Sequence, residues 1–146
     1  LTEGGLAAEI DPHIRDAVWS KLLGNIATNP LSVLCGATLD RMFGEPALLA
    51  TVRAQMVEAL AVGAACGVRF EQDLEERIDI GRKLGAFRTS MLQDFEAGRP
   101  LELAGIADAV LELAERFGLS MPVTRTIVEL AREADFNSIR RRSPKP

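Results

Sequence analysis

Three polar side chains lie four residues apart in the otherwise small and apolar stretch from Trp19 to Pro30. They are the amine of Lys21 and the carboxamides of Asn25 and Asn29. On a helix, residues four apart share one slowly drifting stripe, which here would be roughly 12 Å long. Such a row in apolar surroundings predicts a site for a small polar ligand. The alternatives are a surface lysine, a satisfied core amide at Asn25 and a helix cap at Asn29.

The elements that position this stripe are predicted to be helices. Asp11-Pro12 is typical of a helix start, and apolar residues then recur at helical spacing. Pro30 lacks an N–H and clashes with the preceding turn, so we expect the helix to kink or restart there, with Asn29 capping the next one. Further helices are expected over 46–66, 73–83, 90–97, 103–117 and from 122 onward. With no strand-like alternation, the fold class is predicted to be all-α, a compact bundle of about six or seven helices.

The length of 146 residues fits one domain. We expect residues 1–10 to be a linker from a missing upstream domain. Residues 11–136 would form the helical domain, and 137–146 a basic, disordered tail. Because the first residue is Leu1 rather than Met, we expect the chain to be a piece of a longer protein.

Charge and composition argue against several classes of protein. A net charge of −4 without clustered Lys and Arg before the tail argues against a nucleic-acid partner. The isolated Cys35 and Cys66 predict two buried thiols in a reducing, cytoplasmic protein, rather than a disulfide or a metal site. His13 is the only histidine, which excludes most catalytic triads and His-rich metal sites. The longest nearly uncharged run, 22–40, is too polar to predict a membrane span.

A second polar segment covers residues 88–102. Thr89 or Ser90 can cap a short helix, and Gln93 stands three residues after Ser90, as in a capping box. Glu102 falls at the start of the following helix, where a carboxylate interacts favourably with the helix dipole. From the pattern alone, Ser90 is best interpreted as the cap.

Together the two segments carry a recognisable set of motifs. These are Trp19-x-Lys21-Leu22-x-x-Asn25-x-x-x-Asn29-Pro30-Leu31, Ser90-Met91-Leu92-Gln93-Asp94, Gly98-Arg99-Pro100-Leu101-Glu102 and the junction Gly118-x-x-x-Pro122. In this order and spacing, over residues 10–135, they resemble the C-terminal domain of ketopantoate reductase (2-dehydropantoate 2-reductase). The resemblance implies a helical domain of the 6-phosphogluconate dehydrogenase-like type, which closes over an N-terminal Rossmann domain that binds NADPH.

The resemblance also implies roles for five residues. Lys21 would be the general acid in the reduction of a 2-oxo acid to a 2-hydroxy acid. Asn25 and Asn29 would bind substrate, and Ser90 would bind its carboxylate. Glu102 would join the catalytic network and reach the nicotinamide ribose. The implied protein is a cytoplasmic oxidoreductase of pantothenate biosynthesis, with this chain as its substrate and dimerisation half, inactive alone.

Two departures from the family pattern affect the expected substrate. Leu39 stands where some ketopantoate reductases have a substrate-side Asn, and Leu103-Ala104-Gly105 lacks an Asp often found after the glutamate. The substrate is therefore ketopantoate or a related 2-oxo acid. The alternatives are the helical domain of another β-hydroxyacid or opine-type dehydrogenase, and a dimerisation or binding module without chemistry.

Overall fold

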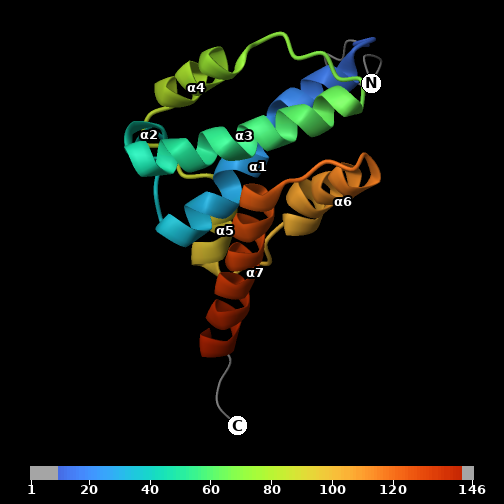
Figure 1. The fold of residues 1–146 in the computed structure, drawn as a ribbon. Coiled ribbons are helices and arrows are strands. Elements are labelled where there is room, and N and C mark those ends of the chain that lie inside the picture. The colour runs from blue at the N-terminus through green and yellow to red at the C-terminus, as the bar shows by residue number, and fades with distance from the viewer. Residues whose placement is uncertain (1–9, 143–146) are drawn as a thin grey trace, which may run out of the picture.

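The computed structural model describes residues 10–142, and their regular structure is entirely helical (Figure 1). Seven α-helices and one π-helical segment occur within this range: α1 (Ile14–Cys35), α2 (Leu39–Gly44), α3 (Pro46–Ala65), α4 (Leu74–Lys83), α5 (Ser90–Ala97), η2 (Ala104–Asp108), α6 (Ala109–Arg116) and α7 (Pro122–Arg142). The all-α prediction is confirmed. The predicted linker, apart from residue 10, lies outside the described residues.

Helix α1 is the centre of the fold. It contacts α3, α5 and α7, and Figure 1 shows it crossing behind α3. Every residue from Ile26 to Val33 is buried, so this part of the helix is enclosed on all sides. Of the predicted stripe, Asn29 lies in this enclosed segment, whereas Asn25 is half-buried and Lys21 is exposed.

The predicted break at Asn29-Pro30 is wrong, because α1 continues through Pro30 to Cys35. Proline removes one helical hydrogen bond, but the surrounding burial holds the segment in place. Ser32 Oγ donates to the Asn29 carbonyl at 2.6 Å, which adds a local bond beside the proline. Asn29 is consequently an interior residue of α1 and caps no helix.

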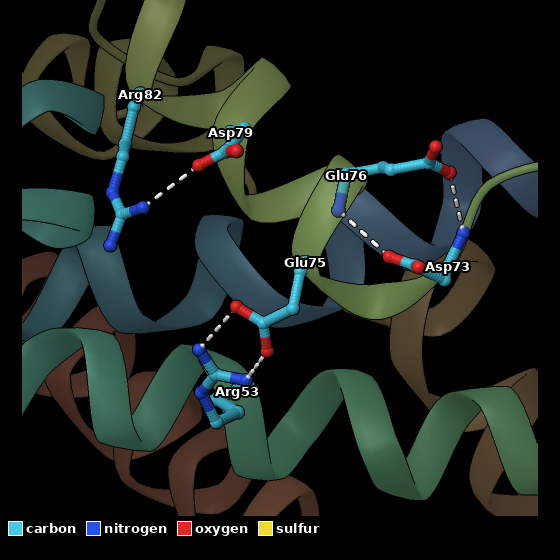
Figure 2. A network of polar contacts seen from close by, with 6 residues as sticks. All are labelled: Arg53, Asp73, Glu75, Glu76, Asp79 and Arg82. Atoms are coloured by element: carbon cyan, nitrogen blue, oxygen red, sulfur yellow. Dashed lines mark hydrogen bonds and ion pairs between the residues drawn. The ribbon is translucent and has the colours of Figure 1, made fainter.

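Helices α3 and α4 pack over α1 and α2. Asp73 and Glu76 form a capping box at the start of α4, and Arg53 of α3 pairs with Glu75 of α4, with Nη2 to Oε2 at 3.0 Å (Figure 2). These contacts fix the start of α4 and its position above α3. Among the described helices, α3 is long and apolar enough to cross a membrane, a test that soluble core helices also pass, and 33% of its apolar window is buried.

The C-terminal half contains α5, η2, α6 and α7. The cap of α5 is Thr89 rather than Ser90: Thr89 Oγ1 accepts from the Leu92 N–H at 3.1 Å, and Ser90 is the first helical residue. The start of α7 is capped from a distance by Glu58 of α3, whose carboxylate oxygens accept from two backbone N–H groups at 2.9 and 2.8 Å. This contact joins α3 to α7.

Two further predictions are corrected. Helix α7 includes residues 137–142, which we had assigned to a disordered tail; residues 143–146 lie outside the described range. Arg140 stacks over the Phe136 ring, with 5.5 Å from its guanidinium carbon to the ring centroid, and this supports the last turns. The cysteines are free but not buried: Cys35 is exposed at the end of α1, and Cys66 is half-buried.

Candidate functional site

A cavity of about 610 Å³ lies where α1, α2, α4 and α5 meet, with one contribution from α3. This volume is in the range of small-molecule sites. Most of its polar lining comes from α1 and the start of α5, with Gln72, just before α4, and Arg77 of α4 added, and much of its apolar lining comes from α2 and α4. The cavity therefore has a polar wall and an apolar wall.

The polar wall is one face of α1. Ser20, Gly24, Asn25, Thr28 and Asn29 line the cavity. At about 100° per residue, they cover about half of the helix circumference. Asn25 is half-buried, whereas Asn29 is only 3% exposed. The predicted carboxamide pair thus faces one cavity from successive turns.

The buried amide of Asn29 is incompletely hydrogen-bonded. Its Nδ2 has no hydrogen-bond partner, and its Oδ1 receives only a long contact of 3.5 Å from Thr28 Oγ1. That hydroxyl also donates to the Gly24 carbonyl at 2.9 Å. Because buried donors are nearly always paired in native proteins, this N–H of a cavity-lining residue is free to donate to a ligand or to ordered water.

Ser90 also lines the cavity, from the first turn of α5. The preceding Thr89 anchors this turn to α1, because the Thr89 and Ser32 hydroxyl oxygens are 2.6 Å apart and share a hydrogen bond. Both of these residues are buried, whereas Ser90 is exposed. The sequence pattern favoured Ser90 as the helix cap. In the structure Thr89 is the cap, and the exposed Ser90 hydroxyl is available to a ligand.

Lys21 and Glu102 do not line the cavity. Lys21 is exposed, but its position falls within the arc of α1 that faces the cavity, one turn before Asn25. Glu102 is also exposed and lies just before η2. Neither side chain makes an ion pair within the part of the chain that the structure describes. The structure thus brings Asn25, Asn29 and Ser90 together and leaves the other two outside the lining.

Arg77 is a lining residue that the sequence reasoning missed. The charged run 73–83 is typical of a helix that faces solvent, but Arg77 turns inward. Its Nη1 donates to the Ser20 carbonyl at 2.9 Å, and its guanidinium carbon lies 5.8 Å from the centroid of the Phe70 ring. Burial lowers the pKa of this guanidinium from its usual value. The sequence held one signal of this inward position. Arg77 stands three residues after Leu74, so it lies on the same face of α4 as the apolar stripe.

The apolar wall includes Leu39 and Phe43 of α2, Ile80 of α4, and Leu84 and Phe87 from the connection to α5. Leu39 is the position at which the sequence departs from some ketopantoate reductases. The structure places this departure in the lining of the cavity.

Taken together, the fold and site define a class: an all-helical domain with a cavity lined by amides, hydroxyls and one guanidinium. The family model described as "Ketopantoate reductase PanE/ApbA C terminal" matches residues 13–135. The chain belongs to the ketopantoate reductase family, as its C-terminal domain, which confirms the resemblance found in the sequence.

Individual relatives agree with this assignment. The chain is 37% identical over 132 residues to the 2-dehydropantoate 2-reductase of Mesorhizobium japonicum, covering 90% of this chain and 40% of that protein. Among solved structures, the 2-dehydropantoate 2-reductase of Methylococcus capsulatus is 34% identical with a TM-score of 0.77, covering 86% of this chain and 44% of that one. A dimeric ketopantoate reductase from Staphylococcus aureus is 26% identical with a TM-score of 0.74, covering 88% and 46%. The chain spans less than half the length of these relatives.

Proposed function

We propose that this chain is the substrate-binding half of an NADPH-dependent reductase, which converts ketopantoate or a related 2-oxo acid to the 2-hydroxy acid. The observation that carries the proposal is the convergence of Asn25, Asn29 and Ser90, from two helices, on one cavity with an unpaired buried amide. Family membership supports the reaction type, because the relatives are named for this activity.

The proposed chemistry requires a proton donor beside the substrate carbonyl. Hydride adds to the carbonyl carbon, the C=O double bond opens, and the oxygen takes a proton from the Lys21 ammonium, so that one C–H and one O–H bond form. The position of Lys21 on the cavity side of α1 supports this role, because its flexible side chain can reach the cavity from its mouth. Asn25 lies one turn further in and would hold the substrate oxygen that becomes the hydroxyl.

The neutral donors suit this arrangement. Asn29 and Ser90 can orient substrate oxygens without adding a further positive charge, beyond that of Arg77, that would lower the proton affinity of the lysine. The unpaired Asn29 Nδ2 would gain the acceptor that it lacks. Substrate binding would therefore complete the hydrogen bonding of the polar wall.

NADPH would be held mainly by a second domain, since the chain spans only 40% of the Mesorhizobium japonicum relative. Within this chain, Glu102 suits a ribose hydroxyl, because its carboxylate is exposed and has no hydrogen-bond partner in the described structure. When bound, the nicotinamide supplies the hydride. The 146-residue chain alone would consequently be inactive.

The proposed function also includes an oligomeric state and a cellular location. We propose a cytoplasmic homodimer, in keeping with the dimeric Staphylococcus aureus relative. Helix α3 offers a surface for it, since several of its outward residues are apolar, including Val57 at 51% exposure.

The test is NADPH oxidation by the complete protein with a panel of 2-oxo acids, followed by identification of the product. We expect turnover with at least one branched 2-oxo acid and formation of its 2-hydroxy acid. No turnover with any member of the panel, in a folded protein that binds NADPH, would favour a binding module without chemistry.

A further inference from the structure

Arg77 is the only charged residue in the described lining of the cavity. Within the described residues it has no carboxylate partner, and its Nε is buried without a hydrogen-bond acceptor. Most other arginines of the domain are paired with acids, including Arg82 on the same helix, which contacts Asp79 at 2.8 Å. In the free protein, an unpaired and partly buried guanidinium carries a desolvation penalty that no ion pair offsets.

The Arg77 side chain is also held in one orientation. The Ser20 carbonyl accepts from its Nη1, the Phe70 ring packs against its guanidinium carbon, and the contacts of α4 shown in Figure 2 hold the helix that carries it. A guanidinium has five N–H donors, and the structure assigns an acceptor to one. The remaining donors form a preorganised group that an anion could bind at little entropic cost.

The rest of the lining limits the type of anion. The other lining side chains are neutral, and the proposed role of Lys21 places its ammonium at the carbonyl oxygen, so a second acidic group would have no cation of its own. Leu39, Phe43, Ile80 and Phe87 provide an apolar surface, and Ile80 and Phe87 are 45% and 57% exposed in the free protein. A ligand that covers them would gain hydrophobic stabilisation.

From these contacts we propose that Arg77 binds the carboxylate of the substrate, and that the substrate is a 2-oxo acid with one carboxylate and an apolar body. This inference rests on the proposed function for the reaction, but the binding part does not need turnover. Ser20, to which Arg77 is bonded, precedes Asn25 by five residues, or about 7.5 Å along α1. A small ligand whose carboxylate meets the guanidinium would therefore lie within reach of Asn25 and of the apolar wall.

The experiment measures how each variant of the complete protein distinguishes a branched 2-oxo acid from its primary amide, which is similar in shape but neutral. In the wild type, we expect kcat/KM for the acid to exceed that for the amide by about ten- to a hundredfold, the range of a charge-assisted hydrogen bond. Arg77→Met should reduce this ratio to within about threefold, mainly by raising KM for the acid. Arg77→Lys should retain part of it.

Arg82→Met is the matched control, because it removes an arginine of the same helix outside the cavity. It should leave the ratio unchanged. If Arg77 only joins α4 to α1, Arg77→Met will lower activity on acid and amide equally, and the unchanged ratio overturns the proposal. The ratio is internal to each variant, so a general loss of stability does not imitate the predicted effect.

A second readout needs no turnover. The product-like 2-hydroxy acid, without cofactor, should raise the Tm of the wild type and of Arg82→Met but not that of Arg77→Met. If no 2-oxo acid is reduced, the proposed function fails, but the Tm shift still tests whether Arg77 binds the carboxylate. If the protein prefers a dicarboxylic 2-oxo acid to all monocarboxylic ones, the proposal of a substrate with one carboxylate and an apolar body is wrong.

Discussion

Replacing Gly81 with alanine tests how closely α4 and α2 pack at the cavity. A Cβ on Gly81 would lie 2.3, 2.5 and 2.7 Å from three ring atoms of Phe43, far inside ordinary carbon contact distance of about 3.5–4 Å. Phe43 is only 3% exposed, so its ring cannot retreat without shifting α2 or entering the cavity. Glycine at this position allows the ring to lie against the helix backbone.

Two opposing effects set the size of the change. Overpacking a close-packed core costs about 1–3 kcal/mol. Alanine also gains about 1 kcal/mol over glycine in helix propensity. Because three ring atoms are involved, we expect the overpacking to be larger and the free energy of unfolding to fall by about 1–2 kcal/mol, measured by urea denaturation of the 146-residue chain followed by circular dichroism.

Gly24→Ala is the matched control. Gly24 is also a helical glycine that lines the same cavity, but an added Cβ would meet no atom within 4 Å. It should raise the unfolding free energy by about 0.5–1 kcal/mol through helix propensity alone. If Gly81→Ala is as stable as Gly24→Ala, the close packing of Phe43 on α4 is refuted.

Three further substitutions separate folding from binding. Thr89→Val removes the cap of α5 and the hydroxyl shared with α1, and should lower the unfolding free energy by about 1–2 kcal/mol, whereas Ser90→Ala should leave it unchanged; equal losses would contradict the assigned cap. Glu58→Ala removes both acceptors at the start of α7 and should lower the unfolding free energy by about 1–2 kcal/mol. Hydrogen exchange in the first turn of α7 should become faster, and unchanged exchange there would contradict the role of Glu58 as a cap. Asn29→Leu should leave stability equal or higher, because it removes an unpaired buried N–H, while raising KM for substrate in the complete protein; an unchanged KM would mean that the amide binds no substrate.

Much of the fold could be predicted because local signals and packing agree. The predicted helix starts at Pro46 and Pro122 match the structure, and the helix expected over 73–83 is present as α4. The helix through Pro30 could not be predicted, because the local penalty of proline is outweighed by burial of the whole segment from 26 to 33, which local sequence does not reveal.

The site was only partly predictable for the same reason. Spacing along one helix was enough to place Asn25 and Asn29 on one face, and the family motif indicated Ser90. Arg77 was missed because a charged run on an amphipathic helix usually faces solvent, and only the packing of α4 on α2 and α3 brings this side chain to the Ser20 carbonyl of α1. Which of two neighbouring hydroxyls caps α5 depends on the Ser32 contact from α1, which is distant in sequence.

The most direct test of the central proposal is the kcat of Lys21→Ala in the complete protein, with Lys83→Ala as a control for loss of an exposed lysine. If Lys21 is the general acid, its removal should reduce kcat for the 2-oxo acid by about a hundredfold or more, while Lys83→Ala stays at the wild-type value. A kcat for Lys21→Ala within a few-fold of the wild type, in a protein that still reduces 2-oxo acids, would contradict the account.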